Sequence, residues 1–206
     1  ELNELTPLIL DRKMTKSALQ IARAAYQPKL PKALRGSVKV SEGNATQSVA
    51  DQEAIQKLFP NTYGMPLIQF VESSEAVNYP AFNVGVILSG GQAPGGHNVI
   101  SGIFDGIKTQ NKDSKLYGFI LGPGGLVDHN YMELTGDIID EYRNTGGFDI
   151  IGSGRTKLET TEQFDKGYEI LKKLDIKALV IIGGDDSNTN ACVLAEYYAA
   201  KNYGIQ

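Results

Sequence analysis

The pattern of hydrophobic and polar positions changes character near residue 80. From Phe82 onward, apolar runs at 82–88, 115–121, 148–152 and 178–182 alternate with segments that carry apolar residues at helical spacing. Apolar strands separated by helices are typical of a parallel sheet covered on both faces, because each crossover places a helix against the sheet. We therefore predict an α/β fold with a doubly wound parallel sheet.

Two of the intervening helices have readable starts. Thr160 and Gln163 form a capping-box pattern, in which each side chain bonds the backbone N–H of the other residue. Asn130 and Glu133 repeat this pattern ahead of apolar positions at helical spacing. The pattern predicts helices that start at Asn130 and Thr160 and pack their apolar stripes into the core.

The first 80 residues follow a different pattern. Helical stretches near 15–26 and 48–58 are separated by prolines and glycines. Two short helices bury too little apolar surface to fold alone. We predict that 1–80 form an N-terminal helical extension, packed on the first part of an α/β domain that occupies 81–206. Met14 is a candidate for the natural start.

Composition narrows the class of protein. The 206 residues are 41% hydrophobic with a net charge of −4, which indicates a soluble globular chain with one core and disfavours a nucleic-acid partner. No apolar run is long enough for a membrane span, and no signal-peptide pattern appears, so we expect a cytoplasmic protein. The single cysteine, Cys192, excludes an intramolecular disulfide, and its apolar helical surroundings predict a buried thiol.

Each predicted strand ends in a glycine-rich loop. These loops lie at Gly90-Gly91, 122–125, 152–155 and 183–186. In a doubly wound sheet, ligands bind at the carboxyl ends of the strands, and glycines let backbone N–H groups approach a phosphate closely. Glycine is also common in ordinary strand–helix turns, but its presence at every strand end favours one shared anion site.

Charged residues in two of these loops add candidate chemistry. Asp185 and Asp186, followed by Ser187 as a possible helix cap, could hold a divalent cation and phosphate oxygens, although the same residue types also stabilise helix starts without a ligand. Arg155 could bind phosphate with its planar fork of donors, or form a surface salt bridge. His97 and His129 fit polar loop positions better than catalysis.

Three of the quoted segments together resemble one family. The sequences at 90–98, 152–155 and 183–191 resemble, in order and spacing, the phosphofructokinase superfamily and its pyrophosphate-dependent long-chain branch. The similarity extends from about Lys29 to the end of the chain. The resemblance implies a Rossmann-like phosphofructokinase fold and reversible, magnesium-dependent transfer of a phosphoryl group from pyrophosphate to fructose 6-phosphate.

The resemblance also implies residue roles. Asp185 would hold Mg²⁺, and Gly91 would donate its backbone N–H to the phosphoryl donor. Asp186 stands where ATP-using relatives have glycine, so its carboxylate would exclude a nucleotide and determine donor specificity. Diphosphate binding is implied for Gly90, Gly91, Arg155, Gly184 and Ser187.

The sequence departs from the family pattern after Gln206. The family base lies in a Thr-Ile-Asp-Gly-Asp motif beyond the helix that Ser187 opens, and neither this motif nor the sugar-phosphate arginines are present. We therefore expect an incomplete domain that supplies only the donor side of the site and is inactive by itself. The resemblance further implies a homo-oligomer for the full-length protein.

Two alternatives remain open at this stage. One is an ATP-dependent phosphofructokinase or a related kinase with a Gly-Gly-Asp strand end, against which Asp186 argues. The other is a noncatalytic regulatory subunit of the pyrophosphate enzyme, against which the retained acidic motif argues.

Overall fold

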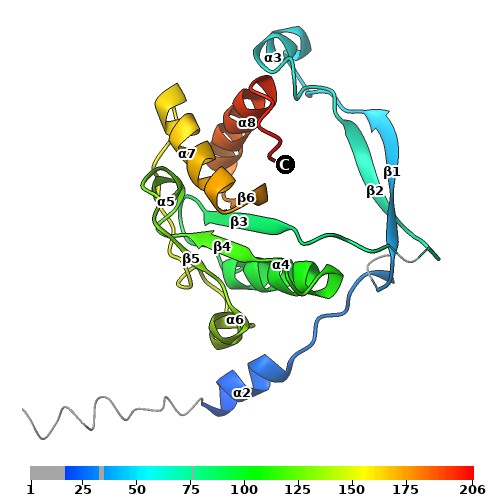
Figure 1. The fold of residues 1–206 in the computed structure, drawn as a ribbon, viewed down its shortest axis with the longest axis vertical. Helices are drawn as coiled ribbons and strands as arrows, with labels where there is room; N and C mark the ends of the chain where they lie inside the picture. The colour runs from blue at the N-terminus through cyan, green and yellow to red at the C-terminus, as the bar shows by residue number, and fades with distance from the viewer. Residues whose placement is uncertain (1–16, 33–34, 76) are drawn as a thin grey trace, which may run out of the picture.

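The computed structural model describes residues 17–32, 35–75 and 77–206 (Figure 1). The candidate start at Met14 and the first two positions of the predicted helix 15–26 lie outside the described residues. In the described part of the chain, no helix has both the length and the apolar character needed to cross a membrane.

A four-stranded sheet forms the centre of the α/β part. Its order is β5-β4-β3-β6, with β3 (Asn83–Leu88) parallel to β4 (Leu116–Phe119) and to β6 (Ile176–Ile182). The edge strand β5 (Tyr131–Glu133) runs antiparallel to β4. The last residue, Gln206, exchanges backbone hydrogen bonds with Lys177 and Leu179 on the other edge. The prediction of an α/β sheet is confirmed, although the sheet is mixed and not wholly parallel.

Helices cover both faces of this sheet, as the doubly wound prediction requires. α4 (Gly96–Gln110) and α6 (Gly136–Tyr142) cover one face, and α7 (Thr161–Lys173) and α8 (Asp185–Ala200) cover the other (Figure 1). The short helix α5 (Pro123–Val127) packs on the side of α7.

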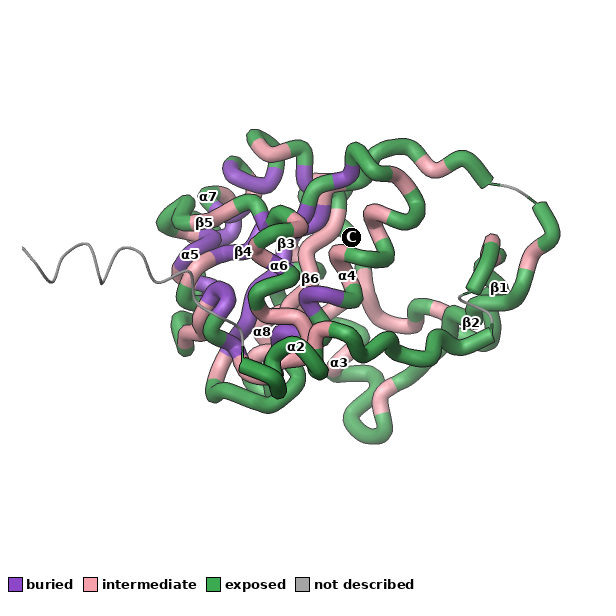
Figure 2. Tube along the Cα trace, turned by 90° about the horizontal axis from the view of Figure 1, so that it is seen from below, coloured by how far each residue is buried: buried purple, intermediate pink, exposed green. Residues whose placement is uncertain are grey.

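Strand β3 shows how the alternating side chains build two cores. Val84, Val86 and Leu88 point into the cluster shared with α4 and α6, whereas Ile87 points into the cluster shared with α7 and α8. Successive side chains of a strand face opposite sides, so one apolar strand supplies both clusters. The buried residues therefore concentrate around β3 and β4 (Figure 2).

One predicted strand is wrong. Residues 148–152 form a buried turn in which Gly152, at φ 63°, donates its N–H to the carbonyl of Phe148 at 2.8 Å. The residues here are apolar because the segment is buried. A short buried apolar run looks the same in sequence whether it forms a strand or a turn. The turn still runs along the sheet, because Ile151 accepts a hydrogen bond from the Leu121 N–H at 2.9 Å.

The two predicted helix starts have different outcomes. The capping box of Thr160 and Gln163 is present at the start of α7. The start at Asn130 is wrong, because Tyr131–Glu133 form β5 and α6 begins only at Gly136, after the N-cap Thr135. Pairing with β4 therefore overrides the local capping pattern around Asn130.

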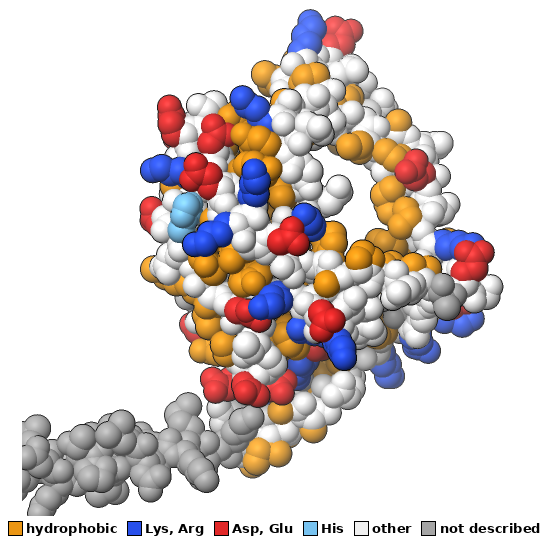
Figure 3. All heavy atoms as spheres, viewed as in Figure 1, with side chains coloured by type: hydrophobic (Ala, Val, Ile, Leu, Met, Phe, Trp, Pro, Cys, Tyr) orange, Lys and Arg blue, Asp and Glu red, His pale blue; other side chains and the backbone are white. Residues whose placement is uncertain are grey.

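The N-terminal extension contains more than the helices that we expected. The helices are α2 (Ala18–Ala25) and α3 (Gln52–Leu58), but an antiparallel pair, β1 (Val38–Ala45) and β2 (Pro66–Glu72), was missed. Nearly all residues of this strand pair are exposed (Figure 2). Apolar side chains lie on the surface of the arm that the pair forms (Figure 3). The proposed boundary between residues 80 and 81 stays a prediction.

Side chains of the α/β part bond the extension at two places: Asn144 donates to the carbonyls of Arg23 and Tyr26, and a carboxylate of α8 accepts from the segment after α3. Glu196 on α8 accepts hydrogen bonds from the backbone N–H groups and side chains of Asn61 and Thr62. Burial of the carboxylate acts to raise the pKa of Glu196, but these hydrogen bonds outweigh it, so the pKa is lowered. The ionised form of Glu196 is therefore the one that holds the extension on α8.

Cys192 also differs from its prediction. It lies on α8 as expected, but its side chain is exposed and not part of the core. The apolar neighbours Val193 and Leu194 lie on different sides of the helix, and only Leu194 is buried. A run of apolar residues therefore did not identify which position of the helix faces inward.

Candidate functional site

The site begins where β3 ends. The N–H of Ser89 donates to the carbonyl of Ile182 at 2.8 Å, and the N–H of Gly90 donates to the carbonyl of Gly154 at 2.8 Å. Gly90 has φ 88°, a conformation that glycine adopts without the steric cost that other residues meet. The end of β3 is thereby joined to the end of β6 on one side and to the 152–155 loop on the other.

The close approach of two loops explains glycines that the sequence analysis assigned to ligand binding. A Cβ added at Gly122 would lie 2.5 Å from the backbone nitrogen of Gly154, and one added at Gly154 would overlap the carbonyl oxygen of Leu121. Glycine at these two positions is therefore required by packing. The 122–125 loop packs against the 152–155 loop, and none of its residues lines the candidate cleft.

A cleft of about 180 Å³ lies at this edge of the sheet. Of the predicted site residues, it brings together Gly90, Arg155, Asp186 and Ser187. Gly91 adjoins the cleft, since a Cβ added there would lie 3.4 Å from Nη2 of Arg155. Loops that are far apart in sequence therefore converge at one edge of the sheet, although the 152–155 loop follows a turn and not the strand predicted at 148–152.

The two acidic residues open helix α8. Gly184 is the N-cap, and Asp185 and Asp186 are both exposed in the first turn, where negative charge interacts favourably with the helix dipole. Asp186 lines the cleft, whereas Gly184 and Asp185 lie beside it at the same helix start.

We expected Ser187 to cap the helix, but the N-cap is Gly184. Ser187 lies within the first turn, and its Oγ donates to Oγ of Ser89 at 2.8 Å. A Cβ added at Gly183 would lie 2.5 Å from Ser187 Oγ, so glycine at 183 makes room for this bond. The serine pair therefore connects the start of α8 to the end of β3 across the floor of the cleft.

Four residues that line the cleft were not predicted from the sequence: Ser89, Thr156, Lys157 and Asn190. The proximity of Thr156 and Lys157 to Arg155 in the same loop was a signal that could have found them. Asn190 had a weaker signal, its position four residues after Asp186, which places both on one face of α8.

His97 is buried, contrary to the polar loop position that we predicted. It lies in the first turn of α4 with 2% of its surface exposed, and it does not line the cleft. Its Nδ1 lies 2.9 Å from Thr145 Oγ1, and its Nε2 accepts the N–H of Ile150 at 3.1 Å. His97 thus holds the turn that leads to Arg155. His129 is exposed, and its Nε2 lies 3.0 Å from the carbonyl oxygen of Lys166.

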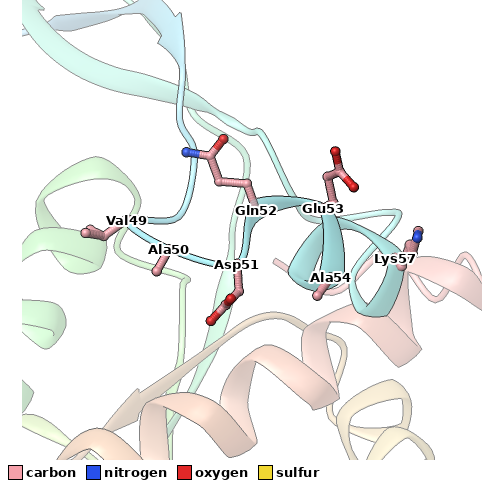
Figure 4. Close-up of a pocket in the computed structure, with 7 residues that line it drawn as sticks. All are labelled: Val49, Ala50, Asp51, Gln52, Glu53, Ala54 and Lys57. Carbon is pink, nitrogen blue, oxygen red and sulfur yellow. The ribbon is translucent and has the colours of Figure 1, made fainter.

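A larger hollow, of about 660 Å³, lies beside α3 (Figure 4). It is lined by residues 49–54 and Lys57. The side chains of Gln52, Glu53 and Lys57 point in different directions, so they do not converge on a common ligand (Figure 4). Size therefore does not select the candidate site, whereas the convergence of polar groups favours the smaller cleft as the candidate.

The carboxylates can be compared with the needs of a metal ion. In the described part of the chain, no group of three or more His, Cys, Asp or Glu side chains is arranged to hold a metal. Mg²⁺ usually takes one or two carboxylates and completes its shell with water and phosphate oxygens. The Asp185 carboxylate therefore has the chemistry that a magnesium ion held jointly by protein, water and phosphate would use.

The chain is similar to known proteins over most of its length. Over 193 residues, 94% of its length, the chain is 66% identical to a pyrophosphate–fructose 6-phosphate 1-phosphotransferase of Porphyromonas gingivalis, and it covers 35% of that protein. It is 49% identical over 187 residues, 90% of its length, to the subunit beta 1 of such an enzyme from Arabidopsis thaliana, of which it covers 33%. The chain thus spans about a third of the length of these relatives.

The fold has solved counterparts as well. The crystal structure of a pyrophosphate-dependent phosphofructokinase from Nitrosospira multiformis matches with a TM-score of 0.55 at 21% identity, over 62% of this chain and 32% of that one. The family model for phosphofructokinase matches residues 83–205, which are more than half of the chain. The resemblance found in the sequence is thereby confirmed, and the chain belongs to the phosphofructokinase family.

Proposed function

We propose that this chain forms the phosphoryl-donor side of an enzyme that transfers a phosphoryl group from pyrophosphate to the 1-hydroxyl of fructose 6-phosphate, reversibly and with Mg²⁺. The observation that carries the proposal is the cleft in which Gly90, Arg155 and Asp186 meet at the carboxyl end of β3 and β6. The relatives named above, with the same reaction in their names, support it.

Binding of the diphosphate falls to backbone N–H groups and one guanidinium. Gly91 at the end of β3 and Gly184 at the start of α8 carry no side chain that would keep an anion from their N–H groups. The N–H of Gly90 is already bonded to the Gly154 carbonyl, so Gly90 contributes only space for the anion. Arg155, beside Gly91, offers a planar fork of donors that can bind two phosphate oxygens at once. Ser187, bonded to Ser89, holds the two sides of the cleft together.

Magnesium is assigned to Asp185. When bound, Mg²⁺ would neutralise charge on the phosphate oxygens, which phosphoryl transfer requires. The protein side of the reaction is then mainly positioning of the donor and exclusion of water. A base that accepts the proton of the sugar hydroxyl is also needed, and no residue of the described cleft is assigned to that role.

Asp186 is assigned to donor choice. It lines the cleft together with Arg155, and we assign to its carboxylate the space that a nucleotide would need for its α-phosphate. A carboxylate about 4 Å from another negative charge meets repulsion on the order of 4 kcal/mol at an effective dielectric of about 20. Pyrophosphate, which lacks that third phosphate, avoids the repulsion.

Kinetic comparison of the complete gene product that contains this sequence tests the proposal. The wild type should form fructose 1,6-bisphosphate with pyrophosphate and not with ATP. Asp186→Gly should relax the exclusion of ATP and weaken the use of pyrophosphate, whereas Asp185→Asn, one position away, should lower turnover with either donor. Equal donor preference in wild type and Asp186→Gly would refute the role of Asp186.

We also propose several properties of the whole protein. We expect the complete gene product to be cytoplasmic and to self-associate, with neither nucleic acid nor a membrane as partner. The 206 residues by themselves should show no phosphotransferase activity. A wild type without turnover on either donor would favour a noncatalytic regulatory role.

A further inference from the structure

We propose that Lys157 is a second cationic ligand of the phosphoryl donor and that Asn190 is the residue that positions it. The inference rests on the proposed function and extends it, since the diphosphate site described above contains one cation, Arg155. Lys157 lies in the segment 154–158, which is held at both of its ends.

Both ends of this segment are fixed to different elements. At one end, the carbonyl of Gly154 accepts the N–H of Gly90 at 2.8 Å, and Gly154 forms a parallel bridge with Ser89. At the other end, the side chain of Asn190 accepts the N–H of Leu158 at 3.0 Å and donates to its carbonyl at 2.6 Å. The three residues between these points span the cleft from β3 to α8.

The second attachment is strengthened by burial. Leu158 is 2% exposed and belongs to the core cluster with Phe164 and Leu194. The Asn190 amide bonds both the N–H and the carbonyl of Leu158, and so provides the two hydrogen bonds that a neighbouring strand would otherwise make to this buried residue. Asn190 therefore fixes the position of Leu158 and, through it, of the neighbouring Lys157.

This geometry presents two cations to one cleft. Arg155 and Lys157 are both exposed, and both line the cleft together with Asp186 of α8. Among the described residues, neither side chain has an ion-pair partner within 4.0 Å. Magnesium pyrophosphate remains an anion, so an ammonium group beside the guanidinium would offset the repulsion from the aspartates.

Substitutions in the complete gene product test the inference through the KM for pyrophosphate. Lys157→Met should raise this KM by about ten- to a hundredfold, the range expected when a charge-assisted hydrogen bond is lost. Lys157→Arg should retain most of the affinity, because the charge is kept. Lys29→Met, which removes an exposed lysine that does not line the cleft, is the matched control and should behave as wild type.

Asn190→Ala tests the positioning role. It should raise the KM for pyrophosphate while the KM for fructose 6-phosphate stays within about twofold, a split that general loss of structure would not produce. Circular dichroism of the variant should match that of the wild type. An unchanged pyrophosphate KM in Asn190→Ala would refute this part.

The outcomes separate the inference from the proposed function. If the wild type turns over pyrophosphate and Lys157→Met has an unchanged KM, or if Lys157→Arg is impaired as strongly as Lys157→Met, only the role of Lys157 is refuted. If the wild type shows no turnover with pyrophosphate, the proposed function fails. Calorimetric titration with magnesium pyrophosphate then decides on Lys157: binding that Lys157→Met weakens supports the inference, and absence of binding overturns it.

Discussion

Replacement of His97 by leucine should destabilise the protein strongly. The ring is buried in the first turn of α4, and Ile150 donates its backbone N–H to Nε2 at 3.1 Å. Nε2 is therefore unprotonated and Nδ1 carries the proton, which it donates to Thr145 Oγ1 at 2.9 Å. Thr145 in turn donates to the carbonyl of Tyr142 at 2.6 Å. One neutral histidine thus joins α4 to the turn that leads to Arg155.

The loss in the free energy of unfolding can be worked out from the two hydrogen bonds that leucine cannot make. The Ile150 N–H would be buried without an acceptor, which costs about 1–3 kcal/mol, and the bond to Thr145 contributes roughly 0.5–1.5 kcal/mol. We therefore expect the free energy of unfolding to fall by about 2–4 kcal/mol. His129→Asn, at an exposed position with φ 55°, is the control and should change it by less than about 1 kcal/mol.

The pH dependence provides a second check on His97. Burial lowers the pKa of His97, although the Asp149 carboxylate and the Gly146 backbone act in the opposite direction. Because the unfolded chain then binds a proton more readily than the folded one, His97 contributes a loss of stability as the pH falls through the unfolded value of about 6.5. His97→Leu should lack this component. Urea unfolding curves at several pH values measure it, and parallel pH profiles for wild type and variant would refute the neutral, buried histidine.

Three further substitutions test other parts of the structure. Gly154→Ala should abolish pyrophosphate turnover in the complete gene product, because the added methyl group overlaps the Leu121 carbonyl and displaces the loop; wild-type kinetics would contradict this close approach. Glu196→Ala should lower the protection of residues 59–64 against hydrogen exchange, and the wild type should lose the same protection, measured against the intrinsic rate at each pH, as the pH falls through the lowered pKa of Glu196, since the ionised carboxylate accepts those bonds. Thr160→Ala should lower the free energy of unfolding by about 1 kcal/mol through loss of the bond to the Gln163 N–H, and an unchanged urea midpoint would argue against the cap.

The sequence predicted those features that depend on local pattern and on the rules of parallel sheets. The apolar runs at β3, β4 and β6 identified the strands, and the rule that ligands lie at their carboxyl ends predicted that Gly90 and Asp186 lie at one place. Arg155 lies there too, although the strand at 148–152 from which it was predicted is a turn. These features needed no knowledge of distant contacts.

Other features depend on contacts that no single segment reveals. α6 begins later than predicted because Tyr131 pairs with β4. The role of Asn190 depends on Leu158, which lies beside α8 and bonds to it. The burial of His97 likewise depends on the turn around Ile150, more than 50 residues away. Side chains that satisfy distant backbone groups leave little trace in sequence periodicity, so their roles appear only in the folded chain.

A crystal structure of the complete gene product with magnesium pyrophosphate would test the central claim most directly. The account predicts one diphosphate in the cleft, with oxygens at the Gly91 N–H and at the Arg155 guanidinium, and Mg²⁺ on the Asp185 carboxylate. A diphosphate bound at another site, with this cleft holding only water, would contradict it.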